Sequence, residues 1–438
     1  MIAFQNDLNY NLYRQRLLGG NVSGLWKNNV YFLGSNSYPV PKYHYLTAQF
    51  NDFEKNIFSD GMKVNYHLSG YGTQYNEALT SFLGESSERY SFTLLYQNIK
   101  NIVVRSTYSD LKKDYPNELV LDLSLVNVYF KESDSQHFIT SNDVLSWVPM
   151  HSLFNPDQKV FIPLQMVVLF DNEIFNNEKQ FLNSAVSTGT ASHETFEKSL
   201  QNALVEILQI DSYNLWWYAG LSGTTLNVNI QEKISSWFDG ESVSDFLNNF
   251  IVHFTDITFD KSIPIVVCEI SAKNKPDSLP KYVVGVQGGT DINKCVYRSF
   301  FEALTVLEYS LTAVWNDADK FNSVKNDLKN LNIDNLDDNV VFFAKYGLQN
   351  LRKEHSLKLN QPKKAHSLQD IVKSIEKFSK YACYLNITPT EFFDKNMTVS
   401  RAIVPELLPI ALPSFPPYQH PRYREFGGVV NNVPHPMA

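Results

Sequence analysis

The stretch SGYGTQYNEALTSFLGESSERY, residues 69–90, decides how the rest of this 438-residue sequence is interpreted. Its second half has the apolar spacing of a helix, which places Glu85 and Glu88 on one face, with Ser81 one turn earlier. Two carboxylates on one face repel each other, so the arrangement needs a compensating positive group. Arg89 and water supply one answer, and a metal ion with a phosphate behind it supplies another.

The bulk composition argues against several classes of protein. A net charge of −8 and a pI near 5.7 disfavour a nucleic-acid binder that works through a basic surface, although a single bound nucleotide depends only on local charge. Cys268, Cys295 and Cys383 are far apart and form no CxxC pattern, which disfavours a structural zinc site or a disulfide framework. No signal-peptide pattern and no run of about 18 apolar residues occurs, so we expect a cytosolic protein.

The periodicity of apolar residues predicts a mixed fold. Hydrophobic residues make up 43% of the chain, which is enough for a packed core. Alternating and β-branched stretches predict strands, and a 3.6-residue period predicts helices. The strands are expected at 117–130, 159–170 and 263–272, and the helices at about 72–90, 194–211 and 293–315. Because strands and helices do not alternate strictly, we expect an α/β sandwich of mixed sheets and helices rather than a dinucleotide-binding fold.

Local composition adds four weaker expectations. Residues 1–60 are rich in Asn, Tyr and Gly and are expected to be irregular. A capping pattern at Ser367 predicts a helix that ends near Tyr384. GVQGGT (285–290) is expected to be a turn. Prolines crowd the chain after Pro405, so this part is expected to be extended rather than helical.

Two further helices carry charges in apolar company. The helix at 293–315 places Arg298 one turn before Glu302 within VYRSFFEALTVLEY. The helix at 194–211 carries a polar stripe made of Glu194, Lys198, Asn202, Glu206 and Gln209. Both can be ordinary solvated faces, with an i,i+4 ion pair worth little when it is exposed. Alternatively, several carboxylates suit Mg²⁺ and arginine suits phosphate, so a magnesium–nucleotide site is a second hypothesis, although no Walker, kinase or GxGxxG motif is present.

Three segments taken together resemble the YcaO family. SGYGTQYNEALTSFLGESSERY is similar to its first signature, a glycine-flanked turn followed by SxxxExxER. STGTASHETFEKSLQNALVEILQIDSYNLWWY resembles the second signature, and YRSFFEA resembles the third. TVSRAIVPELLPI looks like the late strand of the family, and VPHPMA resembles its proline-rich tail. Within the family, VNYHLSGYG and STGTASH look most like the streptolysin-S-type D proteins.

The resemblance implies three parts of one unit and a fold of mixed sheets packed with helices around a nucleotide cleft. These parts are an N-terminal segment (1–60), a catalytic domain (61–410) and a proline-rich tail (411–438). It implies an ATP- and Mg²⁺-dependent cyclodehydratase that acts on a ribosomally made precursor peptide. In such a reaction a Cys, Ser or Thr side chain attacks the preceding carbonyl, and phosphorylation of the resulting oxyanion by ATP lets the oxygen leave as phosphate.

The resemblance also implies partners and a place in the cell. A separate E1-like (ThiF-like) protein would bind the leader of the precursor, and a flavin-dependent dehydrogenase would oxidise the azolines. A second copy of the chain is a further candidate partner, and nucleic acid is not expected. The protein would act in the cytosol, either free or in a membrane-associated synthetase complex.

Site residues are carried over from the family one position at a time. The expected metal ligands are Glu85, Glu88, Glu206 and Glu302. The expected ATP-binding residues are Ser81, Arg89, Lys198 and Arg298. The end of the tail, through Pro434, Pro436 and Ala438, is expected to act in catalysis, with the terminal carboxylate ordering donors or accepting a proton. His193 and His435 are weaker candidates for a general base, and Trp216, Trp217 and Tyr218 are expected to pack in the core.

Several positions depart from the family pattern. Tyr71 stands where lysine is usual, Glu194 where asparagine is usual, and Lys198 and Gln209 where acidic residues are usual. Lys198 could neutralise charge in place of a lost cation. Because of these departures, a second hypothesis is a protein without catalytic activity that only organises the modification complex. A third hypothesis keeps the ATP site but changes the nucleophile, which would make the protein a thioamide- or amidine-forming enzyme.

Overall fold

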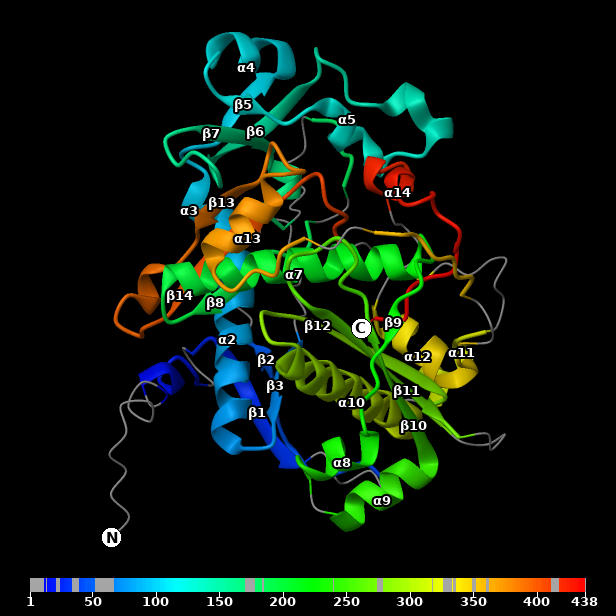
Figure 1. Cartoon of the computed structure of the whole chain (residues 1–438). Coiled ribbons are helices and arrows are strands. Elements are labelled where there is room, and N and C mark those ends of the chain that lie inside the picture. The colour runs from blue at the N-terminus through cyan, green and yellow to red at the C-terminus, as the bar shows by residue number, and fades with distance from the viewer. Residues whose placement is uncertain are drawn as a thin grey trace.

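The computed structural model describes most of the chain, and the elements below belong to that part. The described residues are 12, 14–20, 24–33, 39–51, 67–169, 178–182, 185–238, 240–273, 279–316, 318–325, 333, 336–348, 352–359, 362–410 and 417–437. Three sheets and the helices between them make up the fold, with helix α7 near the middle (Figure 1). None of the described helices is long and apolar enough to cross a membrane.

A three-stranded antiparallel sheet carries the first signature. It has the order β1-β2-β3, with β1 at Trp26–Leu33, β2 at His44–Phe50 and β3 at His67–Gly72. Helix α2 (Tyr75–Thr93) follows β3 directly and packs against it. Gly70 allows this close approach, because a Cβ there would collide with the backbone of α2. The expectation that residues 1–60 are irregular was therefore wrong for β1 and β2, because β1 pairs with β2 and β2 pairs with β3.

A four-stranded antiparallel sheet carries the third signature. Its order is β12-β11-β10-β9, with β9 at Thr224–Thr225, β10 at Phe250–Asp256, β11 at Ile265–Ala272 and β12 at Tyr282–Gly288. Helix α10 (Ile292–Asn316) packs on β11 and β12.

A seven-stranded sheet forms the other half of the molecule. Its main path is β5-β7-β6-β13-β14-β8, with β4 paired to β6, and only the pair β5–β7 is parallel. The strands are β4 Val104–Thr107, β5 Leu119–Val120, β6 Val144–Ser152, β7 Lys159–Pro163, β8 Thr190–His193, β13 Cys383–Asn386 and β14 Thr398–Ile403. Helix α7 (Phe196–Trp217) follows β8 and packs on β8 and β14.

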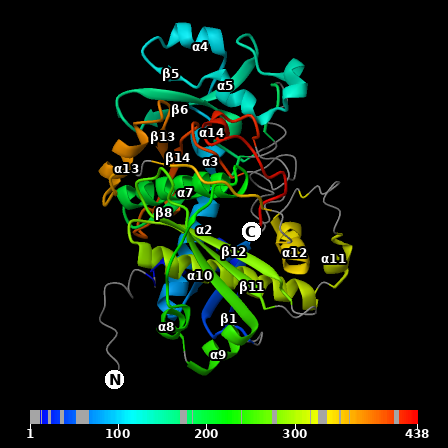
Figure 2. The same ribbon diagram turned by 45° about the vertical axis from the view of Figure 1, so that its right-hand side comes forward.

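Helix α7 connects the two halves. It contacts β8 and β14 of the large sheet and β12 of the four-stranded sheet, so it lies between them (Figures 1 and 2). Its C-terminal half is buried on all sides, so the polar Gln209, Asp211, Ser212 and Asn214 are buried together with their apolar neighbours. Trp216, Trp217 and Tyr218 are fully buried, which confirms the prediction that they pack in the core. The remaining helices are α3 Leu95–Ile99, α4 Tyr108–Asp114, α5 Leu123–Val126, α8 Ile230–Ser235, α9 Gly240–Asn249, α11 Ala318–Ser323, α12 Leu336–Tyr346, α13 Leu368–Ile375 and α14 Pro421–Glu425.

Other local expectations were wrong where a cap or a partner strand decides the structure. The apolar stretch 117–130 holds only the two residues of β5, because Asp122 caps α5 by accepting from the Ser124 N–H. Ser367 does start α13, but the helix ends at Ile375 and the chain then enters β13, which pairs with β14 and β6.

Three more expectations need partial correction. In 159–170 the strand ends at Pro163 and a 3-10 turn follows, with residue 170 outside the described part. GVQGGT begins inside β12 rather than forming a turn throughout. Beyond Pro405, α14 is helical, with His420 as its N-cap and Pro421 in its first turn, where proline fits.

Candidate active site

Three glutamates are held in the same way. Each lies on a helix and accepts a hydrogen bond from a backbone N–H in or next to the strand that precedes this helix. The three pairs are Ser69 N to Glu85 Oε2 at 2.9 Å, Gly189 N to Glu206 Oε2 at 2.9 Å, and Val286 N to Glu302 Oε2 at 3.1 Å. Donor and acceptor are 16, 17 and 16 residues apart, so α2, α7 and α10 repeat one strand–helix arrangement.

Burial of the carboxylates raises their proton affinity. The pKa of Glu302 is raised to about 8 by burial and by the charge of Glu206, while the Val286 N–H opposes the shift. Burial also raises the pKa of Glu206. The pKa of Glu88 is raised well above its usual range by burial and, to a lesser degree, by Glu206 and Glu85. Glu88 on α2 and Glu302 on α10 both respond to the charge of Glu206 on α7, so the three helices bring their acidic groups near one another.

Arg89 provides part of the positive charge. Its guanidinium lies 3.8 Å from Glu85 and 3.6 Å from Glu88, and it donates to Ser187 Oγ. The pKa of Glu88 nevertheless stays raised, so its burial outweighs the attraction of this arginine. A region with this excess of buried negative charge favours an added cation.

Tyr71 joins Arg298 to the same region. The Arg298 guanidinium lies 5.7 Å from the centroid of the Tyr71 ring and 3.9 Å from the Glu77 carboxylate, and it is not ion-paired with Glu302 in the described contacts. Burial raises the pKa of Tyr71, and the charges of Glu302 and Glu85 raise it further, whereas Arg298 lowers it. Glu85, Glu302 and Arg298 therefore all lie within electrostatic reach of one ring.

The turn at 187–190 organises the α7 side of the site. Gly189 has a φ of +84°, and a Cβ there would meet the Ala402 carbonyl oxygen, so the turn requires glycine. Arg401 of β14, which is almost fully buried, donates to the Thr188 carbonyl at 2.7 Å and to Thr190 Oγ1 at 3.0 Å. Sequence reasoning did not single out Arg401, although one arginine inside the apolar strand pattern TVSRAIV was a usable signal.

Of the departures from the family pattern, Gln209 has a clear structural role. Gln209 is buried, donates to the Val286 carbonyl at 3.0 Å and accepts from the Gly288 N–H at 2.7 Å, so it clamps α7 to β12. A carboxylate could not donate to Val286. Lys198 lies at the first turn of α7, is more than half exposed and is 4.0 Å from Glu194.

The remaining predicted residues that the structure describes lie on α2, at the end of β8 and beside the C-terminal end of α7. Ser81 is half-buried on α2, one turn before Glu85. His193 ends β8, and burial together with Lys198 lowers its pKa. Pro434, His435 and Pro436 are buried beside the C-terminal end of α7, whereas Ala438 lies outside the described residues.

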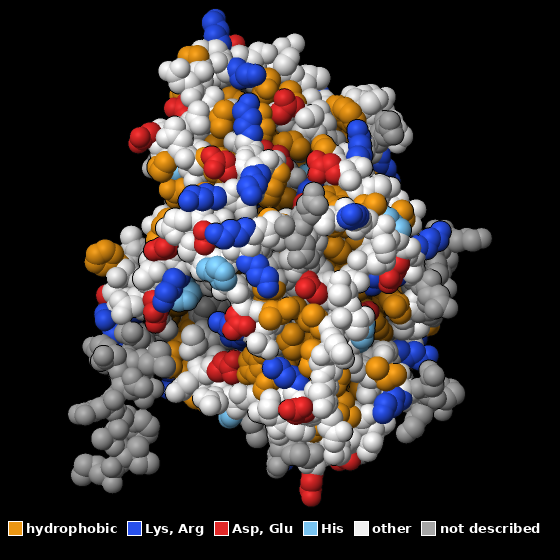
Figure 3. All heavy atoms as spheres, viewed as in Figure 1, with side chains coloured by type: hydrophobic (Ala, Val, Ile, Leu, Met, Phe, Trp, Pro, Cys, Tyr) orange, Lys and Arg blue, Asp and Glu red, His pale blue; other side chains and the backbone are white. Residues whose placement is uncertain are grey.

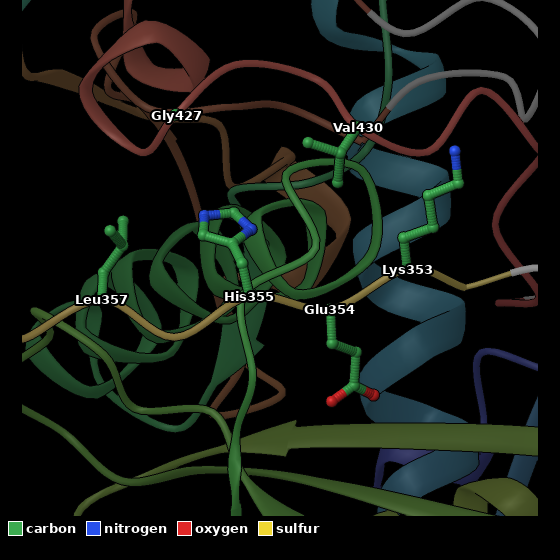
Figure 4. Close-up of a pocket in the computed structure, with 6 residues that line it drawn as sticks. All are labelled: Lys353, Glu354, His355, Leu357, Gly427 and Val430. Carbon is green, nitrogen blue, oxygen red and sulfur yellow. The ribbon is translucent and has the colours of Figure 1, made fainter.

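A separate hollow of about 340 Å³ opens where the tail leaves α14, and none of the predicted site residues lines it. Figure 4 shows the His355 ring pointing toward Gly427, while the Glu354 carboxylate points away from it. The lining residues are Lys353, Glu354, His355, Leu357, Gly427 and Val430.

Comparison with protein-family models decides the classification. Residues 69–408, more than three quarters of the chain, match the model described as YcaO cyclodehydratase, ATP- and Mg²⁺-binding. This protein belongs to the YcaO family. The matched range lies within the catalytic domain expected at 61–410. No curated protein sequence matches the chain.

Solved YcaO-like structures share its fold. A heterocyclase in complex with substrate and cofactor aligns with a TM-score of 0.68 at 16% identity, over 98% of this chain and 57% of that chain. The microcin synthetase McbBCD complex of Escherichia coli aligns at 0.57 and 15%, covering 89% of this chain and 90% of that one. YcaO from Methanopyrus kandleri, bound with AMPPCP and Mg²⁺, aligns at 0.54 and 13%, covering 92% and 90%.

The donor set fits a magnesium ion with its nucleotide. Mg²⁺ prefers oxygen ligands, and Glu88, Glu206 and Glu302 are half-buried carboxyls whose pKa values are raised. Among the described residues, no three carboxylate, imidazole or thiolate groups stand close enough to hold a metal by themselves. This agrees with the usual behaviour of Mg²⁺, which binds one or two carboxylates and completes its shell with water and phosphate.

Proposed function

We propose that this YcaO protein is the ATP-dependent cyclodehydratase subunit of a peptide-modifying system. It activates backbone amides of a ribosomally synthesised precursor peptide by phosphorylation and converts Cys, Ser or Thr into thiazoline or oxazoline. The observation that carries the proposal is that the acidic groups of α2, α7 and α10 and Arg298 influence one another's region electrostatically, at half-buried positions.

Different residues of the chain have different proposed roles in binding the metal and the nucleotide. Glu85, Glu88, Glu206 and Glu302 are the proposed carboxylate ligands, with one or two of them bound to any one Mg²⁺, which when bound neutralises charge on the nucleotide phosphates. The three backbone N–H groups fix the glutamates before the nucleotide arrives, so little reorganisation is needed on binding. Arg298 is only partly buried and is held by Tyr71 and Glu77, which leaves its planar fork suited to phosphate oxygens. Ser81, Arg89 and Lys198 complete the proposed nucleotide contacts.

Helices α7 and α10, which carry part of the proposed site, pack on apolar cores, and the site glutamates themselves are half-buried. In the proposed reaction a side-chain oxygen or sulfur of the precursor bonds to the preceding carbonyl carbon. The carbonyl oxygen accepts the phosphoryl group, and the C–O bond then breaks as phosphate leaves with that oxygen. The peptide loses two protons, one from the attacking side chain and one from the amide nitrogen as the ring C=N bond forms, and the end of the tail would take up or orient one of them.

Partners and location are part of the same proposal. An E1-like protein that binds the leader, a flavin-dependent azoline dehydrogenase and a second copy of this chain are the proposed partners, and the microcin synthetase relative is itself a complex. On the face drawn in Figure 3, the described Lys and Arg side chains are interspersed with acidic ones, which favours a peptide over nucleic acid as substrate. We place the reaction in the cytosol, where ATP and newly made peptide occur together.

Two alternatives have specific support. A scaffold without catalysis is favoured by Gln209, which serves as a clamp where the family has an acid. A thioamide- or amidine-forming enzyme would use the same nucleotide site, but the ordered proline tail speaks for ring formation.

One experiment tests the function. The protein is incubated with its partner, the precursor and Mg–ATP, and the peptide is then weighed. Loss of one water mass per ring, with release of one phosphate, is expected. A mass gain equal to the exchange of oxygen for sulfur would show thioamide formation, and an unchanged peptide despite partner binding would show a scaffold.

A further inference from the structure

The C-terminal segment is fastened to the end of α7 before it reaches its last residues. The N–H groups of Val430 and Asn431 both donate to the Tyr218 carbonyl, at 2.9 Å and 3.1 Å. The side-chain amide of Asn431 donates to the Trp217 and Lys353 carbonyls. The chain is thereby fixed at one end, directly after the glycines that follow α14.

Beyond this point, every second residue is held by a side chain of the protein body. Trp217 Nε1 donates to the Val433 carbonyl at 2.8 Å, the His435 N–H donates to Tyr218 Oη at 3.3 Å, and Asn339 Nδ2 donates to the Met437 carbonyl at 2.8 Å. This alternation is typical of an extended segment that presents one edge to its partner. We call residues 432–437 the C-terminal strap.

The two intervening positions are Pro434 and Pro436, and both are buried. Proline has no amide N–H, so neither residue brings a donor into a place where it would lack a partner. A buried donor without a partner costs about 1–3 kcal/mol. The proline spacing therefore matches the free edge of the strap, and it also limits the freedom lost when the segment is ordered.

The strap lies against the C-terminal half of α7, two turns beyond the Glu206 position. The His435 ring lies 5.9 Å from the Tyr213 ring, measured between centroids. Tyr213 is two turns after Glu206 on α7, and the charge of Glu302 contributes to the raised pKa of Tyr213, behind burial, Tyr218 and Glu269. The strap and the glutamates therefore share α7, with Tyr213 between them.

Asn339 holds the last contact. It lies on α12, which packs against β12 and α10, and it is fully buried. Its Oδ1 atom is buried without a hydrogen-bond partner among the described residues, so the donation to Met437 is its single described side-chain hydrogen bond. Burying an asparagine with only one side-chain hydrogen bond costs free energy of folding, which indicates a role for this bond.

We propose that Asn339 is a positioning residue that fixes the end of the C-terminal strap against the active site. It fixes the Met437 carbonyl, so that the end of the strap faces the groups on α7 and α10. This inference rests on the proposed function for its effect on turnover, but the hold on the strap can be measured without any turnover.

The test compares Asn339→Leu with Asn339→Ala, in the full chain and in a chain that lacks residues 434–438. Leucine has a similar shape and removes only the polar contacts. The control is Asn127→Leu, because Asn127 also binds a backbone carbonyl, that of Ile139 at 3.0 Å, away from the strap. The readouts are turnover, KM for ATP, and the rate at which a carboxypeptidase removes the last residues.

In the full chain we expect both Asn339 variants to lower kcat about tenfold, with KM for ATP unchanged, and to speed carboxypeptidase digestion by a similar factor. In the truncated chain the same variants should change kcat no further. Unchanged digestion would overturn the hold on the strap. Faster digestion with an unchanged kcat, or an equal loss in the truncated chain, would overturn the positioning role. If the wild-type chain modifies no precursor, the proposed function fails and the positioning role falls with it, while the digestion rates still decide whether Asn339 holds the strap.

Discussion

Replacing Gln209 by glutamate restores the acid that the family pattern has at this position, and the structure predicts that the change is harmful. Gln209 Nε2 donates to the Val286 carbonyl at 3.0 Å, and an ionised carboxylate would put two acceptors against each other. The variant can keep the contact only if the new carboxyl stays protonated and donates. The side chain at position 209 is buried and close to Glu206 and Glu302, whose pKa values are already raised, and both conditions favour the protonated form of a glutamate there.

The cost of holding that proton follows from linkage. The unfolded chain releases it near pH 4.3, so each pH unit above this value costs about 1.4 kcal/mol until the folded carboxyl also ionises. At pH 7 the loss of stability is therefore on the order of 3–4 kcal/mol, and near pH 4.5 it is close to zero. The stability gap between Gln209→Glu and wild type is expected to grow as the pH rises.

Urea unfolding without Mg²⁺ at pH 5, 6 and 7, followed by tryptophan fluorescence, measures this gap. Asn202→Glu is the matched control, because it adds the same charge to the exposed side of α7 and should show no such pH dependence. A Gln209→Glu protein as stable as wild type at pH 7 would refute the clamp. Tighter Mg–ATP binding in that protein would mean that this position still serves as a ligand.

Three further predictions test single contacts. Glu206→Gln can still accept from the Gly189 N–H but loses its charge, so the free energy of unfolding should change by less than about 1 kcal/mol. Phosphate release should fall at least about a hundredfold. Retained turnover would remove Glu206 from the site. Gly189→Ala should destabilise the protein by about 2 kcal/mol or more in urea unfolding, because of its φ and the contact with the Ala402 carbonyl; a wild-type midpoint would contradict the strained turn. Arg422→Met should lower the free energy of unfolding by about 3–5 kcal/mol, because the buried Asp211 loses an ion-pair partner. Arg422 and Lys261 lower the pKa of Asp211 against the effect of burial. The control variant, Arg424→Met, removes an exposed arginine and should change stability little.

Long, strongly periodic helices could be predicted from the sequence because burial of one stripe fixes them locally. The helices expected at 194–211 and 293–315 are present as α7, which starts two residues later and ends six residues later than expected, and α10, which is one residue longer at each end. β1 and β2 could not be predicted in this way, because their order comes from cross-strand pairing. The same holds at 383–386, where pairing with β14 replaces the expected helix.

The candidate site was predictable only in part. Family signatures pointed to Glu85, Glu206 and Glu302, but not to the backbone amides that hold them, because each pair is 16 or 17 residues apart with a turn between. The bond from Arg401 to Thr188 spans 213 residues, and no local pattern reports a contact of that separation. The meaning of Gln209 likewise depended on seeing β12 beside α7.

The central claim is that these buried carboxyls form the binding place of a cation with its nucleotide, and proton release on binding tests it directly. At pH 7 a carboxyl with a pKa of about 8 is about nine-tenths protonated, so binding of Mg²⁺ with a non-hydrolysable ATP analogue should expel close to one proton from Glu302. Calorimetric titrations in two buffers of different ionisation heat count the protons. We predict Mg²⁺-dependent binding with release of about one proton or more, and clearly less release in Glu302→Gln. Binding without Mg²⁺, or the same release in that variant, would contradict the account.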